Sequence, residues 1–203
     1  MLLLYAVAFG LIAGVLTRGR LSALGAVKIR YWQVALAGLA FQVLLFSSPL
    51  ATVVGDLGPA LYVGSSVVVL VALLTNIRQP GFWLIVVGAL ANLIAIVANG
   101  GQMPASAEAW ALLNGVPELP PAEFSNAVIA TPDTPFYFLG DLFVLPRPFP
   151  FANVFSIGDA LIGVGGAWFV IAVMHGKRPA DAARSEDPAR RSPRTTTRPA
   201  HQA

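Results

Sequence analysis

The sequence predicts an all-α integral membrane protein with five transmembrane helices, its amino terminus outside, its carboxyl terminus inside, and an outer loop cap between helices four and five. Three observations predict this class. Of the 203 residues 56% are hydrophobic and 11% charged, whereas ordinary soluble domains are about 25% charged. Five continuous apolar stretches approach the ~20 residues that one crossing needs. The basic residues gather in every second connection and in the carboxyl-terminal tail, as five crossings with an inward carboxyl terminus require.

The apolar stretches are expected to be helices, because a helix satisfies its own backbone polar groups inside a bilayer. The in–out alternation of a barrel wall is missing from them. The five stretches are Leu2–Leu16, Trp32–Phe46, Leu61–Leu74, Phe82–Ala98 and Ile157–Met174. The first three are short and need flanking residues to complete a crossing. Gly10 and Gly14 form a GxxxG pattern in the first stretch, which we interpret as close packing within the molecule.

Lysine and arginine near the ends of spans mark the cytoplasmic side. Twelve of the 13 basic residues fall in segments that this topology places inside, and Arg147 is the exception. Five of them, Arg18, Arg20, Lys28, Arg30 and Arg78, lie in the two connections that this topology places inside, and the other seven lie in the tail. We therefore predict an outward amino terminus and an inward carboxyl terminus.

The chain divides into a five-helix membrane domain, residues 1–176, and a disordered basic cytoplasmic tail, residues 177–203. Two interpretations of the tail stay open: a solvated segment that fixes topology, or a segment that contacts anionic lipid heads. The outer cap covers residues 99–156. Within it we expect a short helix at 106–115, begun by Ser106 and ended by Gly115, and an interfacial or re-entrant segment at 135–146.

Asp159 stands at the start of the last apolar stretch and has three interpretations. Ser156 and Asp159 match a capping box, which alone would explain the carboxylate. Alternatively, Asp141 lies eighteen residues earlier on the same outer side, and two close carboxylates supply a general acid and a general base for hydrolysis of an amide. The third interpretation is a polar site for transport, with Gln42, Ser65, Ser66 and Asn92 as further polar groups in the spans. Such groups more often join helices by hydrogen bonds.

The stretch "FANVFSIGDALIGVG" (151–165) resembles the Phe-Asn-Val-Ala-Asp-Ser-x-Ile motif of the lipoprotein signal peptidases. That resemblance implies that Asp159 and Asp141 are the catalytic pair and that Asn153 matches the motif's asparagine. The stretch "LGDLF" (139–143) departs from the family's Gly-Asn-x-x-Asp-Arg motif, because it lacks the asparagine and the arginine.

Most of residues 1–178 resembles a second family, the bacterial membrane proteins of domain of unknown function 5317. The resemblance rests on "NGGQMPAS" (99–106), "FLGDLFVLPRPFPFANVFSIGDALI" (138–162) and the basic link after the first span. It implies a multi-pass protein of the bacterial inner (plasma) membrane with about five helices. It does not indicate any particular activity.

Together these observations predict a multi-pass membrane protein with a polar site on its outer face. Its expected members are Asp141 and Asp159 as the catalytic pair, supported by Asn99, Gln102, Asn153 and Ser156. The alternatives are an aspartyl peptidase or other hydrolase that uses the pair, and a small-molecule or ion transporter, so whether the protein is an enzyme stays open. The expected partner is the lipid bilayer. The chain has no cysteine, and we expect no metal, no cofactor and no nucleic acid.

Overall fold

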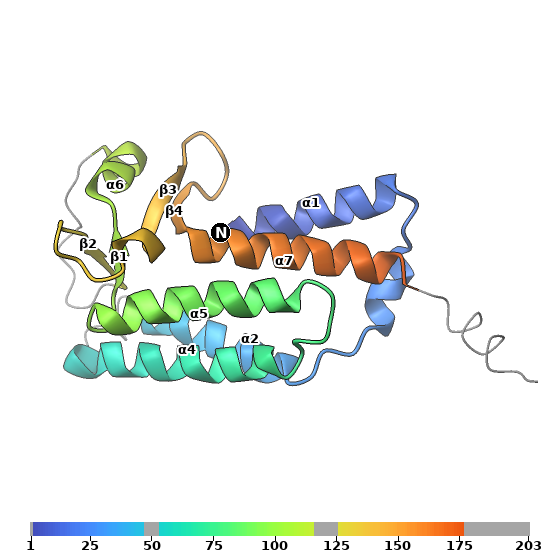
Figure 1. The fold of residues 1–203 in the computed structure, drawn as a ribbon, viewed down its shortest axis with the longest axis horizontal. Coiled ribbons are helices and arrows are strands. Elements are labelled where there is room, and N and C mark those ends of the chain that lie inside the picture. The colour runs from blue at the N-terminus through green and yellow to red at the C-terminus, as the bar shows by residue number, and fades with distance from the viewer. Residues whose placement is uncertain (1, 47–52, 116–125, 177–203) are drawn as a thin grey trace, which may run out of the picture.

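Five apolar helices form a bundle, and a small cap of strands and one short helix covers one end of it (Figure 1). The computed structural model describes residues 2–46, 53–115 and 126–176. The bundle helices are α1 (Leu2–Leu16), α2 (Trp32–Leu45), α4 (Gly58–Leu74), α5 (Phe82–Ala98) and α7 (Ile157–Met174). Their positions confirm the predicted helices. Only α4 differs clearly, because it begins three residues early with Pro59 in its first turn, where the missing N–H breaks no hydrogen bond.

Two helical stretches of the described chain, Gly55–Leu74 and Ile157–Met174, are long and apolar enough to cross a membrane. The first of them includes the short 3₁₀ helix η2 (Gly55–Leu57). The remaining bundle helices, α1, α2 and α5, are apolar but shorter. A further 3₁₀ helix, η1 (Leu21–Ala26), lies in the connection between α1 and α2.

The helix α7 lies between α1 and α5, while α4 packs against α5 on one side and α2 on the other. The contact between α1 and α7 is close because glycine faces α7. A Cβ on Gly10 would lie 3.0 Å from the Ala167 Cα, and one on Gly14 would lie 2.4 Å from the Met174 sulfur. The GxxxG pattern therefore packs within the molecule, as predicted.

Amide side chains join neighbouring helices in the bundle. The Gln42 Nε2 atom on α2 donates to the hydroxyls of Ser65 and Ser66 on α4, both at 3.1 Å. The bonds of Gln42 confirm the prediction that polar groups in the apolar helices join neighbouring helices. In the connection after α4, Asn76 is buried and pairs with the backbone of Arg30, accepting from its N–H and donating to its carbonyl, both at 2.8 Å.

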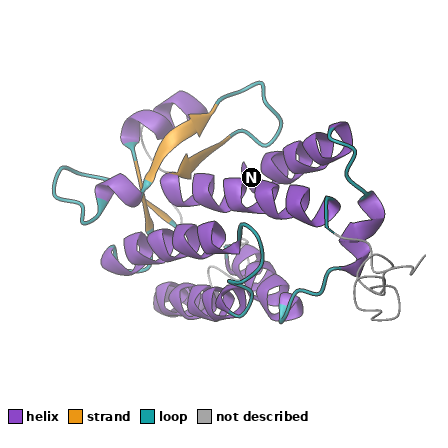
Figure 2. Ribbon diagram, turned by 45° about the vertical axis from the view of Figure 1, so that its right-hand side comes forward, coloured by secondary structure: helices purple, strands orange, loops and turns teal. Residues whose placement is uncertain are grey.

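The all-α prediction is wrong for the cap, which contains a four-stranded sheet in the order β2-β1-β3-β4 (Figure 2). Strand β1 (Met103–Ala105) pairs in parallel with β2 (Ala127–Ile129) and with β3 (Asp141–Leu145). Strand β4 (Asn153–Ser156) runs antiparallel to β3 and leads directly into α7. Strands of three to five residues are too short to show a reliable alternation in sequence.

The other predictions for the cap had mixed outcomes. Helix α6 (Ala107–Asn114) forms as expected: the Ser106 hydroxyl accepts from the Ala109 N–H at 3.3 Å, and Gly115 ends the helix at a φ of 81°. The segment 135–146, predicted to be interfacial or re-entrant, forms the 3₁₀ turn η3 (Tyr137–Leu139) and then β3, and its position relative to a membrane stays a prediction. The tail at 177–203, with both of its interpretations, lies outside the described residues.

Candidate functional site

Asp159 closes a capping box at the start of α7, as the sequence predicted. The Ser156 hydroxyl accepts from the Asp159 N–H at 2.9 Å, and the Ser156 N–H donates to Asp159 Oδ2 at 3.2 Å. The positive end of the helix dipole favours an anion at this position. The side chain of Ser156 is fully buried, so the capping box lies inside the molecule, between the bundle and the sheet, rather than on the surface.

Asn92 on α5 extends this box into a network of three side chains. Its Nδ2 donates to Asp159 Oδ1 at 2.9 Å, and its Oδ1 accepts from the Ser156 hydroxyl at 2.8 Å. Both carboxylate oxygens of Asp159 therefore accept from an N–H donor. From the sequence Asn92 was identified only as a polar group in a span, and its part in this site was missed. It is the one amide within the apolar stretch of α5, and that isolation is the sequence feature that points to it.

Glycine makes the contact between Asn92 and the first turn of α7 sterically possible. A Cβ on Gly158 would lie 1.9 Å from Asn92 Oδ1, and one on Gly88 would lie 2.4 Å from the Gly158 carbonyl oxygen. Any larger residue at position 158 would displace the Asn92 side chain. The two glycines thus allow α5 and α7 to approach at the level of the network.

Asp141 is brought to the same place by the sheet. Its Cα pairs with that of Ser156 across β3 and β4, and directly opposed residues of an antiparallel pair present their side chains on the same face. Burial raises the pKa of the Asp141 carboxyl to about 7, and the negative charge of Asp159 adds to the rise. The structure therefore brings Asp141 within electrostatic range of Asp159, and the catalytic pairing of the two carboxyl groups stays a prediction.

Tyr62 on α4 is a further member of the site that the sequence analysis did not identify. It lies within electrostatic range of both Asp141 and Asp159. Its ring meets Phe46 edge to face at a centroid distance of 4.9 Å, and it packs against the buried cluster that joins α5 to β1. A tyrosine in an apolar helix resembles any interfacial aromatic in sequence, so only the packing of α4 reveals its place.

The predicted supporting residues are less concentrated than expected. Asn99 donates from Nδ2 to the carbonyls of Ala95 and Pro135, at 2.8 and 3.0 Å, and thereby ties the end of α5 to the cap rather than to either carboxylate. Gln102 lies in the turn between α5 and β1, where its N–H donates to the Asn99 carbonyl at 3.3 Å. Asn153 pairs with Leu145 at the far end of the hairpin. Ser156 is the supporting residue whose bonds to Asp159 the capping box explains.

The chemistry open to this site is proton transfer. One carboxyl, Asp159, is held by N–H donors, and the other, Asp141, has its charged form destabilised by burial. Two carboxyl groups that are held in such different environments are typical of acid–base pairs. Among the residues that the structure describes, no group of three or more Asp, Glu or His side chains is placed to hold a metal ion.

Comparisons with known proteins place the chain in a family. The model of a family of unknown function, DUF5317, matches residues 26–171, which is well over half of the sequence and includes Asn92, Asp141 and Asp159. Neither the curated proteins nor the solved structures contain a match to the chain, and none of the comparisons supports the resemblance to the lipoprotein signal peptidases. The chain is therefore a member of the DUF5317 family.

Proposed function

We propose that this protein spans the bacterial inner membrane five times and carries on its outer face a carboxylate pair, Asp141 and Asp159, that hydrolyses amide bonds. The observation that carries the proposal is the pairing of Asp141 with Ser156 across the sheet. It sets a desolvated carboxyl beside the network that holds Asp159.

The exterior of the bundle supports the placement in a membrane. Large apolar side chains point outward all along the helices, with exposures of 64% for Phe9, 78% for Leu16 and 70% for Val43. Soluble monomers rarely leave contiguous apolar surfaces of this extent uncovered. The shortest helix of the bundle, α2, has 14 residues and is about 21 Å long at 1.5 Å per residue. We expect the bilayer to thin locally, or flanking residues to extend this crossing.

The distribution of charge supports the orientation. In the described residues, acidic side chains lie in the cap or at the helix ends beside it, at Asp56, Glu108, Asp133, Asp141 and Asp159. Apart from Arg147, the lysines and arginines lie in the connections at the opposite end. Because basic residues near spans favour the cytoplasm, the cap and the carboxylate pair face outward in the proposed topology.

The proposed reaction uses the two carboxyl groups in different protonation states. The Asp159 carboxylate accepts a proton from a water molecule, and the oxygen of that water forms a bond to the carbonyl carbon of the substrate amide. The protonated Asp141 carboxyl then donates its proton to the amide nitrogen as the C–N bond breaks. The products are a carboxylic acid and an amine. The proton now on Asp159 passes to Asp141, directly or by exchange with solvent, and both groups regain their starting protonation states.

The test compares the full-length protein with three variants, Asp141→Asn, Asp159→Asn and the matched control Asp133→Asn, whose aspartate is exposed in a turn of the cap. Each is reconstituted in vesicles and incubated with a peptide library, and new termini are identified by mass spectrometry. We expect cleavage by the wild type and the control, and its loss in both site variants while insertion is unchanged. Absence of cleavage by the wild type, or cleavage that survives Asp141→Asn, would contradict the hydrolase. Proton flux that depends on Asp159 would replace it with a transporter.

A further inference from the structure

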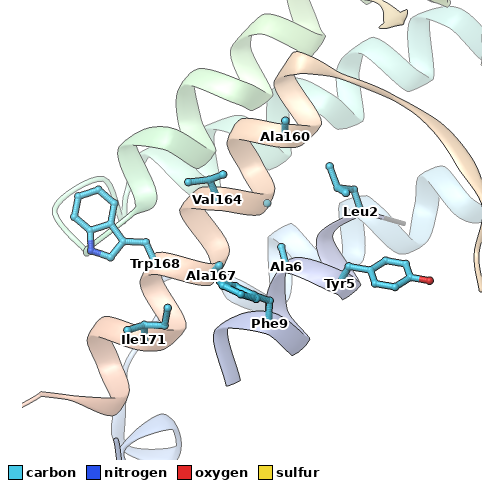
Figure 3. Close-up of a pocket in the computed structure, with 10 residues that line it drawn as sticks. Leu2, Tyr5, Ala6, Phe9, Ala160, Val164, Ala167, Trp168 and Ile171 are labelled. Atoms are coloured by element: carbon cyan, nitrogen blue, oxygen red, sulfur yellow. The ribbon is translucent and has the colours of Figure 1, made fainter. Parts of the chain in front are cut away.

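A groove runs between α1 and α7 on the outside of the bundle, with a volume of about 600 Å³ (Figure 3). Apolar side chains line it, among them Leu2, Phe9, Val164 and Trp168, while the alanines and glycine between the helices leave it open. The volume lies in the range of ~300–1,000 Å³ that is usual for binding sites of small molecules.

The length of the groove matches one leaflet of a bilayer. Its lining on α7 extends from Ala160, next to the start of the helix, to Ile171, which is about 16 Å at 1.5 Å per residue. A hydrocarbon core ~30 Å thick gives each leaflet about 15 Å. In the proposed topology the groove begins at the outer surface, so an acyl chain of the outer leaflet fits along it.

A connection of the cap that carries a positive charge reaches the outer end of the groove. The Tyr5 hydroxyl, at the rim, donates to the Pro150 carbonyl and so holds the connection between β3 and β4 beside the start of α1 (Figure 1). The same connection presents Arg147, which is exposed and is the single basic side chain at the cap end of the described residues. An arginine beside an apolar groove complements a phosphate joined to a hydrocarbon chain.

A helix of a partner protein is a poorer fit for this groove. Close helix approach in a membrane uses small residues, and the glycines of α1, Gly10 and Gly14, already face Ala167 and Met174 of α7. Phe9 and Trp168 line the part of the groove that stays open on the outside. Their bulk keeps a second helix at a distance but leaves room for a narrow acyl chain.

We propose that the α1–α7 groove binds one acyl chain of an anionic phospholipid of the outer leaflet, with the lipid phosphate at Arg147. This binding site rests on the membrane topology proposed above and is independent of the hydrolase activity. Its lining on α7 begins at Ala160, the residue that follows Asp159 in the chain.

The test uses photo-crosslinking in vesicles that contain the full-length protein and a phosphatidylglycerol whose acyl chain carries a diazirine. We expect labels concentrated on residues 2–9 and 160–171. Filling the groove with Ala160→Phe is expected to abolish the concentrated label. The matched control is Ala40→Phe at an exposed alanine of α2, and this variant is expected to keep it. Arg147→Gln is expected to lower labelling by phosphatidylglycerol about fivefold, the effect of roughly 1 kcal/mol per basic residue near the surface, and to leave labelling by phosphatidylcholine unchanged.

Three outcomes would overturn the proposal. If the label is spread evenly over all exposed helices, the lipid only surrounds the protein and does not bind in the groove. Equal labelling of the Ala160→Phe and Ala40→Phe variants means that the groove is not the site. A dimer that Ala160→Phe converts to a monomer assigns the groove to a second copy of the chain. Extraction of the same vesicles with alkaline carbonate reports insertion separately, so failure of the membrane topology is distinguished from failure of the lipid site.

Discussion

At the scale of single residues, Asp159 has two structural partners that the sequence presents very differently. Its capping partner, Ser156, lies three residues away and was predictable from the spacing alone. Its second partner, Asn92, lies 67 residues away, and no local pattern connects the two. The carboxylate is therefore both a helix cap and a member of a network between helices. A capping role alone does not account for the bond from Asn92.

The half-buried carboxyl of Asp141 makes the stability of the protein depend on pH. Its pKa rises from 3.8 to about 7 on folding, so between these values the folded protein holds more protons than the unfolded chain. The free energy of unfolding consequently falls as pH rises through this window, and changes no further above it. We expect the melting temperature of the wild type in detergent to fall between pH 4 and about pH 7.

The Asp141→Asn variant isolates this effect, because asparagine has nearly the same shape and no charge. Its melting temperature is expected to vary less over the same window and to exceed that of the wild type above about pH 7. The Asp133→Asn variant, at an exposed position, is expected to follow the wild type. A wild-type profile that rises with pH, or that Asp141→Asn leaves unchanged, would show that the carboxyl is not desolvated.

At the scale of elements, the network depends on the close approach of α5 and α7 at Gly158. Substitution Gly158→Ala places a Cβ 1.9 Å from Asn92 Oδ1, so the amide must leave Ser156 and Asp159. Overpacking of this kind costs about 1–3 kcal/mol, and we expect a corresponding loss in the free energy of unfolding. The measurement is unfolding of the purified protein in mixed micelles.

The matched control is Gly64→Ala in α4, where an added Cβ meets nothing within 4 Å. Alanine is a better helix former than glycine by about 0.8–1 kcal/mol, so this variant is expected to be at least as stable as the wild type. If Gly64→Ala and Gly158→Ala had the same effect, helix propensity rather than the contact with Asn92 would explain both.

The elements show which features the sequence specifies locally. The bundle helices were predictable because each is a long apolar run in the sequence, and α6 was predictable because Ser106 and Gly115 mark its ends. The sheet was not, because β1 and β2 are three residues each and pair with segments that are distant in the sequence. The site likewise depends on strand pairing that was not predicted: β3 and β4 place Asp141 opposite Ser156, whereas Asn99, which was predicted from its motif, bonds to Ala95 and Pro135.

At the scale of the whole molecule, the separation of charge between the two ends predicts the orientation in the membrane. The chain has no cysteine, so single cysteines report accessibility without background. We expect Asp133→Cys in the cap to react with an impermeant maleimide in cells whose outer membrane has been opened. Arg78→Cys, between α4 and α5, is expected to react only after the inner membrane is permeabilised. The reverse pattern would invert the topology and place the carboxylate pair in the cytoplasm.

The proposed function depends on one half-buried carboxyl, Asp141, that exchanges a proton beside a second carboxylate, Asp159, on the proposed outer face. The most direct measurement is infrared difference spectroscopy of the Asp141 carboxyl in sealed vesicles of known orientation, with Asp141→Asn to assign the band. With the cap facing the medium, we predict that the band titrates with external pH at about 7, and at a lower pH in Asp159→Asn, where the neighbouring charge is absent. A midpoint near 3.8, or one that Asp159→Asn leaves unchanged, would contradict it.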